Sequence, residues 1–169
     1  DDRTDTAGVG GPGGWPTVGG EQLLKSEAPI NFSSSAAFVD YDNDGRLDLY
    51  VCRFAAPNLL YINLGDGSFR EEAAARGLAL TDASNMAAFC DYDRDGWLDV
   101  YVQTNALDAE HNLNGQRDHL FHNNRDGTFT DVSESSGLAD PRWSLNAPVL
   151  DYDRDGDLDL ALTNNHLQG

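Results

Sequence analysis

The nine residues DYDNDGRLD at 40–48 decide the fold, because the chain repeats them twice more with few changes. Each copy follows a short hydrophobic segment and leads directly into alternating apolar residues, LDLYV, LDVYV or LDLAL. The three copies are AAFV-DYDNDGRLD at 36–48, AAFC-DYDRDGWLD at 87–99 and APVL-DYDRDGDLD at 147–159. Self-similarity of this kind along a chain is the signature of a repeat architecture.

A second motif recurs between the acidic segments. The sequence NLLYINLGDGSF at 58–69 matches DHLFHNNRDGTF at 118–129, and a Gly-Leu dipeptide follows each of them, at 77–78 and 137–138. The Asp-Gly pairs inside these segments lie between apolar stretches, which is typical of hairpin turns because glycine accepts a positive φ at little cost. Each period therefore contains material for four short strands.

The spacing of the copies locates an insertion. Asp91 follows Asp40 by 51 residues, whereas Asp151 follows Asp91 by 60 residues. The extra residues fall between Asp99 and Asp118, in a segment rich in Asn, Asp, Gly and Gln, which is loop composition. We expect a surface insertion at roughly 104–117.

Four period-two strands in each period of about 50–60 residues predict an all-β fold built from β-propeller blades. We expect a Gly/Pro-rich lead-in at 1–34 and propeller repeats at 35–169. The repeats divide into blade one at 35–80, blade two at 85–140 and a partial blade three at 145–169. The only helix-like stretch, residues 71–76, is predicted to be strand and loop because its pattern is duplicated.

These repeats amount to about two and a half four-stranded blades, which make a partial β-propeller. Propellers usually close with 4–8 blades. We therefore expect further blades, from the same parent chain or from another subunit, to complete the ring. The chain begins with an aspartate, so either a leader has been removed or the numbering starts inside a longer chain.

The acidic segments have the pattern D-x-D-x-D-G-x-L-D, which predicts three calcium sites. Ca²⁺ takes 6–8 oxygen ligands, and aspartates at positions 1, 3 and 5 converge when glycine at position 6 allows a sharp turn. Position 7 is expected to give a backbone carbonyl and position 9 a fourth carboxylate. The predicted ligands are Asp40, Asp42, Asp44, Arg46 and Asp48 in loop one, Asp91, Asp93, Asp95, Trp97 and Asp99 in loop two, and Asp151, Asp153, Asp155, Asp157 and Asp159 in loop three.

Two alternatives to this interpretation are weaker. An EF-hand needs flanking helices and a bidentate Glu at position 12, but Val51, Val102 and Leu162 occupy that position inside expected strands. An aspartate-rich turn can also cap itself with local hydrogen bonds and bind nothing. Four carboxylates in each of three loops repel strongly without a cation, which favours calcium. Magnesium is less suited because it requires tight octahedral geometry.

Composition limits the partners. The formal charge is −18, and 23 Asp stand against 6 Glu, which fits short carboxylates that hold loops and reach a cation. This charge argues against nucleic acid and anionic membranes as partners. No apolar run approaches the roughly 20 residues of a membrane span. Because extracellular modules bind calcium at about 10⁻⁴–10⁻³ M, we expect an extracellular or cell-surface location, with the periplasm as a further option.

Residues outside the loops carry weaker signals. His119 and His122 point to opposite faces of an expected strand and cannot share one ion, so polar or structural roles are favoured for them. Cys52 and Cys90 fit no zinc pattern, and either pair between adjacent blades or remain free thiols. The second loop residues, Tyr41, Tyr92 and Tyr152, are expected to pack between blades. Trp97 is also a candidate contact for a protein partner or a sugar ring.

Taken together, the DxDxDGxxD loop, the LDLYV strand, the LY-x-N-x-GDG-x-F segment and the Gly-Leu dipeptide resemble the FG-GAP/VCBS-type repeat. The integrin α-subunit propeller has similar loops, as do many bacterial secreted proteins and the cartilage acidic protein group. The resemblance implies calcium-bearing blades from about Ser34 onward. It also implies a binding, adhesion or structural module of a surface assembly, with a protein or glycan partner.

The alternative function is the propeller part of a secreted enzyme that acts on polysaccharides. No catalytic motif stands out, because the chain lacks Gly-x-Ser-x-Gly, a phosphate-binding loop and His-Glu-x-x-His. An acid–base pair can nevertheless be hidden among so many carboxylates. Whether the chain is an enzyme is therefore left open at this point, and the non-enzymatic module is favoured.

Overall fold

The computed structural model describes residues 32–54, 56–104, 117–139 and 144–164. The expected lead-in at 1–34 falls almost wholly outside these ranges, and so does the body of the expected insertion at 104–117. Within them the protein is all-β, apart from two helices of one turn each. Neither helix approaches the length and apolarity that a bilayer-spanning helix needs.

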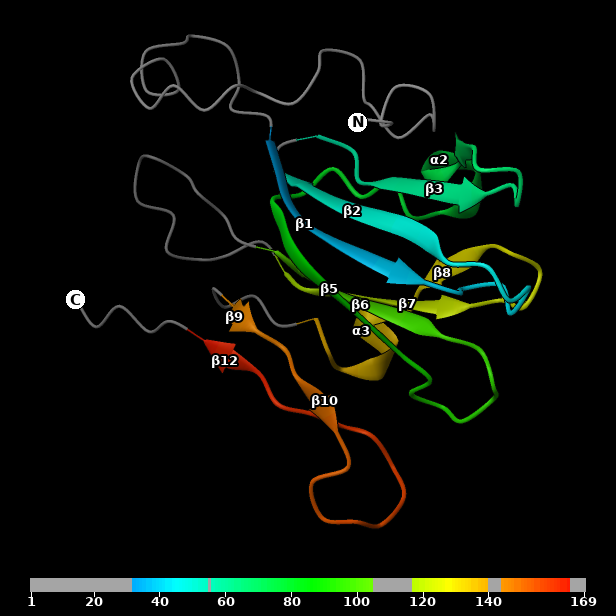
Figure 1. The fold of residues 1–169 in the computed structure, drawn as a ribbon. Helices are drawn as coiled ribbons and strands as arrows, with labels where there is room; N and C mark the ends of the chain where they lie inside the picture. Colours follow the sequence, from blue (N-terminus) through cyan, green and yellow to red (C-terminus); the bar gives the residue numbers. More distant parts are fainter. Residues whose placement is uncertain (1–31, 55, 105–116, 140–143, 165–169) are drawn as a thin grey trace, which may run out of the picture.

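Two four-stranded antiparallel sheets form most of the described chain (Figure 1). The first consists of β1 (Phe32–Val39), β2 (Asp48–Phe54), β3 (Leu59–Asn63) and β4 (Phe69–Glu71), paired in chain order. The second repeats this order with β5 (Ser84–Cys90), β6 (Asp99–Thr104), β7 (His119–Asn123) and β8 (Phe129–Asp131). The prediction of four strands for each complete period is confirmed.

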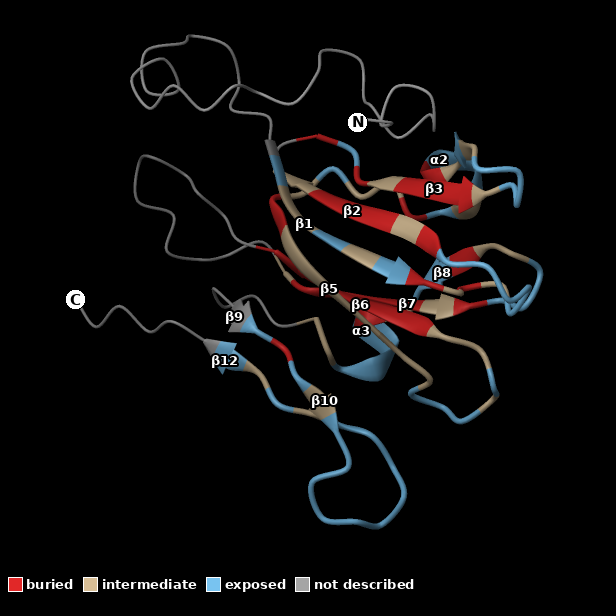
Figure 2. Cartoon of the chain, in the orientation of Figure 1, coloured by how far each residue is buried: buried red, intermediate tan, exposed pale blue. Residues whose placement is uncertain are grey.

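The third repeat has two short strand pairs. The pair next to its acidic loop is β10 (Val149–Leu150) with β11 (Asp159–Leu160), and the second is β9 (Ser144–Asn146) with β12 (Thr163–Asn164). Figure 2 shows that this repeat is mostly exposed, whereas strands β2, β3, β6 and β7 are mostly buried.

The prediction of strand and loop at 71–76 was wrong for the last four of these residues. Residues 73–76 form a one-turn helix, α2 (Ala73–Arg76), and its counterpart in the second repeat is α3 (Ser133–Ser136). The Glu71 carboxylate accepts a hydrogen bond from Ala73 N at 2.8 Å, and Gly77 ends the turn with a left-handed φ of 83°. These features at the two ends stabilise a helix that is too short to show helical periodicity in the sequence.

The two sheets pack against each other through buried aromatic and polar contacts. The Tyr50 and Phe89 rings meet edge to face with centroids 5.8 Å apart, and Tyr41 packs on Phe129 at 5.9 Å. The Asn123 side-chain amide donates to the Tyr41 carbonyl at 2.9 Å. These contacts fix the first acidic loop against the far strands of the second sheet.

The tyrosines at loop position 2 behave differently from one another. Tyr41 is 1% exposed between the two sheets, so its packing role is confirmed. Tyr92 is 39% exposed and Tyr152 is 81% exposed, so neither packs between sheets in the described chain. Cys52 and Cys90 are both free thiols, which agrees with the unpaired alternative.

Candidate metal centre

The acidic loops connect the first and second strands of each sheet. The pairing of Val39 with Asp48 closes loop one, and the pairing of Cys90 with Asp99 closes loop two in the same register. The strand that precedes each loop and the strand that follows it therefore bring positions 1 and 9 toward each other. Two antiparallel strands thus hold each predicted centre, and no helix takes part.

The structure brings three carboxylates together in each loop, with one oxygen from each residue within 4.8 Å of the others. Positions 1, 3 and 5 gather in loops one and two, whereas positions 1, 3 and 9 gather in loop three. The groups are Asp40, Asp42 and Asp44; Asp91, Asp93 and Asp95; and Asp151, Asp153 and Asp159.

A sharp turn produces this convergence. The Asp40 carboxylate accepts hydrogen bonds from Asp44 N and Gly45 N, each at 3.0 Å. Asn43 has a φ of 57° and Gly45 a φ of 83°, so the turn passes twice through the left-handed region. Loop two repeats this pattern, with a φ of 59° at Arg94. Glycine at position 6 adopts the second left-handed conformation without steric strain, because it has no Cβ. The non-glycine residue at position 4 adopts the first one at a steric cost.

Asp48, at position 9, provides a buried oxygen that lacks a partner. The residue is 1% exposed, and its Oδ1 accepts a hydrogen bond from Asn63 N at 2.8 Å. Its Oδ2 is buried and accepts no hydrogen bond of normal geometry, although the Tyr41 backbone N–H lies close enough to lower the pKa of the carboxyl. Burial raises the pKa of this carboxyl from 3.8 to about 6. A buried carboxylate oxygen without a donor is costly, and a cation would satisfy it.

Asp99 holds the same place in loop two. It is fully buried, and its Oδ1 accepts from Asn123 N at 2.8 Å. Its Oδ2 accepts a longer bond of 3.3 Å from Tyr92 N. Burial raises the pKa of Asp99, as it does for Asp42 at position 3 of loop one. The residues present therefore fit a hard divalent cation in both loops.

An arginine pairs with the position-5 carboxylate in both sheets, and sequence reasoning did not anticipate this. In loop one the side chain of Arg46, at position 7, pairs with Asp44 and donates to the Asn63 carbonyl at 2.9 Å. In loop two position 7 is Trp97, and Arg125 from the β7–β8 turn binds Asp95 at 2.6 Å. Although burial opposes it, the Trp97 backbone N–H and Arg125 hold the pKa of Asp95 low.

The remaining position-7 side chain, Asp157, pairs with Arg94 of loop two. Side-chain pairing does not bear on the backbone carbonyls of Arg46, Trp97 and Asp157, so their role as ligands stays a prediction. Trp97 is only partly exposed, and its backbone N–H donates to Asp95 Oδ1 at 2.8 Å.

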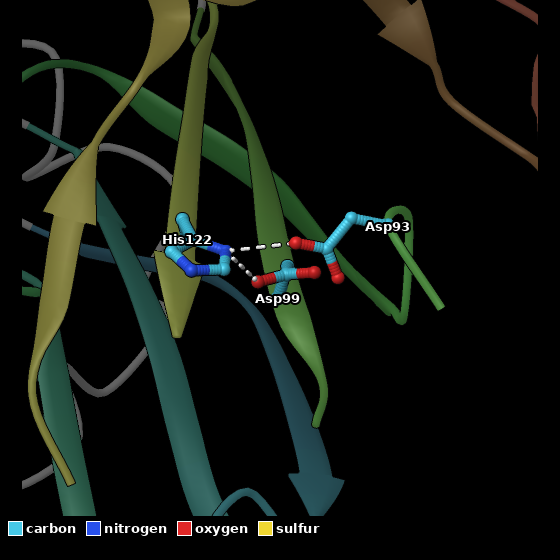
Figure 3. Close-up of side chains that lie close together, drawn as sticks. All are labelled: Asp93, Asp99 and His122. Carbon is cyan, nitrogen blue, oxygen red and sulfur yellow. Dashed lines mark ion pairs between the residues drawn. The ribbon is translucent and has the colours of Figure 1, made fainter. Parts of the chain in front are cut away.

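His122 is a candidate ligand that the sequence reasoning missed. Its Nδ1 lies 3.1 Å from Asp99 Oδ1 and 3.5 Å from Asp93 Oδ2 (Figure 3). Aligning the two complete repeats places His122 opposite Ile62, and that change from an apolar residue was the available signal. His119, on the other face, lies between Asp131 and Asp82, which fits a structural role.

Comparisons with known proteins agree with this architecture. Residues 40–102 and 110–162 match the FG-GAP-like repeat family. Cartilage acidic protein 1 of Homo sapiens is 32% identical over 151 residues, which cover 84% of this chain and 22% of that protein. The Mus musculus protein is 30% identical over the same length, with 84% and 23% covered. The chain thus spans less than a quarter of these relatives, and it belongs to the FG-GAP-like repeat family.

Proposed function

We propose that the three acidic loops bind Ca²⁺ and that the bound ions stabilise the blades. The observation that carries this proposal is the buried Oδ2 atom of Asp48, which accepts no hydrogen bond of normal geometry and whose carboxyl feels the charges of Asp42 and Asp44 in the same loop. Ca²⁺ is the cation suited to a flexible shell of carboxylate and carbonyl oxygens at 2.3–2.6 Å. The predicted ligands at positions 1, 3, 5, 7 and 9 would form that shell.

The role that follows is a binding or structural module that works outside the cell. Extracellular calcium is abundant enough to fill sites of modest affinity. Two relatives named cartilage acidic protein 1 match this chain, and this chain is also acidic, with a net charge of −18. A protein or glycan would be the partner, held on a scaffold that calcium makes rigid.

The test is calcium calorimetry together with thermal unfolding of the chain after chelation. Each site stabilises the folded state by about 2.7 kcal/mol when calcium is a hundredfold above its Kd. We expect saturable calcium binding and a melting temperature that falls by many degrees in excess EDTA. An unchanged melting curve, with loss of metal confirmed by elemental analysis, would contradict the proposal.

A further inference from the structure

His122 adds a nitrogen donor to the second acidic loop. Its side chain extends from β7 toward Asp93 in the loop and Asp99 at the start of β6 (Figure 3). The Nδ1 atom is buried and makes no hydrogen bond, yet it lies 3.1 Å from Asp99 Oδ1 and 3.5 Å from Asp93 Oδ2. Three elements therefore bring one imidazole nitrogen and two carboxylate oxygens together around one point.

These separations suit a small transition-metal ion. Zinc binds histidine nitrogen and carboxylate oxygen at about 2.0–2.2 Å, so two ligands at a tetrahedral angle lie about 3.3 Å apart. The two separations in the structure, 3.1 and 3.5 Å, bracket that value. Imidazole suits zinc, cobalt and nickel, whereas Ca²⁺ and Mg²⁺ take oxygen ligands.

The first sheet shows that the fold does not need a histidine here. Ile62 occupies the matching place in β3 and is 6% exposed, so an apolar side chain packs there without difficulty. Loop one consequently offers oxygen donors alone. In loop two, Arg125 binds Asp95, while Asp93 and Asp99 remain directed toward His122.

We propose that Asp93, Asp99 and His122 form a binding site for a zinc-class divalent ion, which loop one cannot form. Nδ1 of His122 binds the metal in its unprotonated form, with the ring proton on Nε2. Asp93 belongs both to this site and to the carboxylate group at loop positions 1, 3 and 5. The inference goes beyond the calcium proposal and can fail while calcium binding at loop one succeeds.

The experiment is a titration of the chelator-treated chain with Co²⁺, followed by its visible absorption and by competition with Zn²⁺. The wild-type chain is expected to develop absorption bands that Zn²⁺ abolishes. His122→Ile, which copies loop one, should weaken Co²⁺ binding at least about tenfold. Calcium affinity measured by calorimetry should change less than about threefold, because Ca²⁺ takes oxygen ligands.

Three further variants separate ligand loss from misfolding. His122→Gln keeps a polar side chain and should lose the cobalt bands as His122→Ile does. Asp93→Asn should also weaken Co²⁺ binding, whereas Asp42→Asn, at the same position of loop one, should leave the bands unchanged. Bands that persist in both His122 variants, or that never form in the wild-type chain, would overturn the proposal and leave an ion pair only.

Discussion

Asp48 carries a buried charge that opposes folding when nothing compensates it. Its charge is buried with one oxygen unpaired, and the rise of its pKa to about 6 corresponds to a cost on the order of 2–3 kcal/mol for the ionised form. A bound cation would reverse that cost. The calcium proposal therefore predicts that the effect of Asp48 on stability changes sign when the ion binds.

Asp48→Asn tests this reversal. Without calcium at neutral pH, the variant is expected to be more stable than wild type by about 1–3 kcal/mol, because it removes a buried charge. With saturating calcium it should be less stable, because a ligand is missing. Urea unfolding with and without calcium measures both signs. A variant that is destabilised equally in both conditions would show that Asp48 is structural and not a ligand.

The Cys52 thiol makes the free energy of unfolding depend on pH, and this effect does not involve a metal ion. Burial raises the pKa of its thiol from 9.0 to about 11, and the residue is 1% exposed. Between these two values the folded chain keeps a proton that the unfolded chain has lost. The free energy of unfolding must therefore fall as pH rises from 9.0 toward 11, by up to about 2.7 kcal/mol.

Cys52→Ala isolates this contribution. Buried tyrosines also have raised pKa values, with Tyr41 at about 12, so the wild-type slope alone cannot assign the effect. The difference in stability between wild type and variant is expected to shrink across the alkaline window. Urea unfolding of both proteins below and within that window gives the result. Parallel pH profiles would mean that the thiol ionises as readily when folded as when unfolded.

The one-turn helices give a matched pair of glycines that lie in different surroundings. Gly77 after α2 and Gly137 after α3 both have left-handed φ angles, 83° and 76°. A Cβ on Gly77 would lie 2.7 Å from the Phe129 carbonyl of the second sheet, whereas a Cβ on Gly137 would meet nothing within 4 Å. The first helix end is pressed against the neighbouring sheet and the second is open.

Gly77→Ala and Gly137→Ala should therefore differ. In each variant the left-handed conformation of the alanine lowers the free energy of unfolding by about 1–2 kcal/mol. Gly77→Ala must also displace a backbone carbonyl, so we expect it to lose at least about 1 kcal/mol more. Thermal unfolding of the two variants side by side measures the difference. Equal losses would mean that α2 does not pack against β8 as described.

Local signals along the chain predicted the strands, but they did not predict the contact between His122 and the second acidic loop. Period-two apolar runs and Asp-Gly turns are local, so the four strands of each complete period could be identified from sequence. The contact of His122 with Asp93 depends on the pairing of β6 with β7, where Val100 lies opposite Phe121. The insertion between β6 and β7 changes the number of residues between the pairing partners. A fixed repeat length therefore does not predict this contact.

The arginine on position 5 could not be predicted for a related reason. Arg46 reaches Asp44 from within its own loop, but Arg125 reaches Asp95 from a turn thirty residues away. Position 7 is Arg46 in loop one but Trp97 in loop two, where the arginine comes from a different position of the repeat. Only the folded structure shows that the two arginines are equivalent.

At the scale of the whole molecule, exposure rises along the series of equivalent tyrosines. Tyr41 is 1% exposed because Phe129 and Asn123 of the next sheet cover it, while Tyr152 is 81% exposed. Phe38 is 65% exposed, although its counterpart Phe89 packs on Tyr50 of the preceding sheet. Each end of the described array therefore presents a face that a neighbouring blade covers elsewhere in the same chain.

Because a face is exposed at each end of the described array, we expect the 169-residue chain to self-associate on its own. Blade-to-blade contacts bury large aromatic side chains, and exposed ones such as Phe38 and Tyr152 favour association. We expect the calcium-saturated wild-type chain to sediment as concentration-dependent oligomers. The double variant Phe38→Ser with Tyr152→Ser should shift the distribution toward monomer, whereas Ser135→Ala on the exposed side of α3 serves as a control. A monodisperse 18.4 kDa species at every concentration would show that the described blades satisfy their own faces.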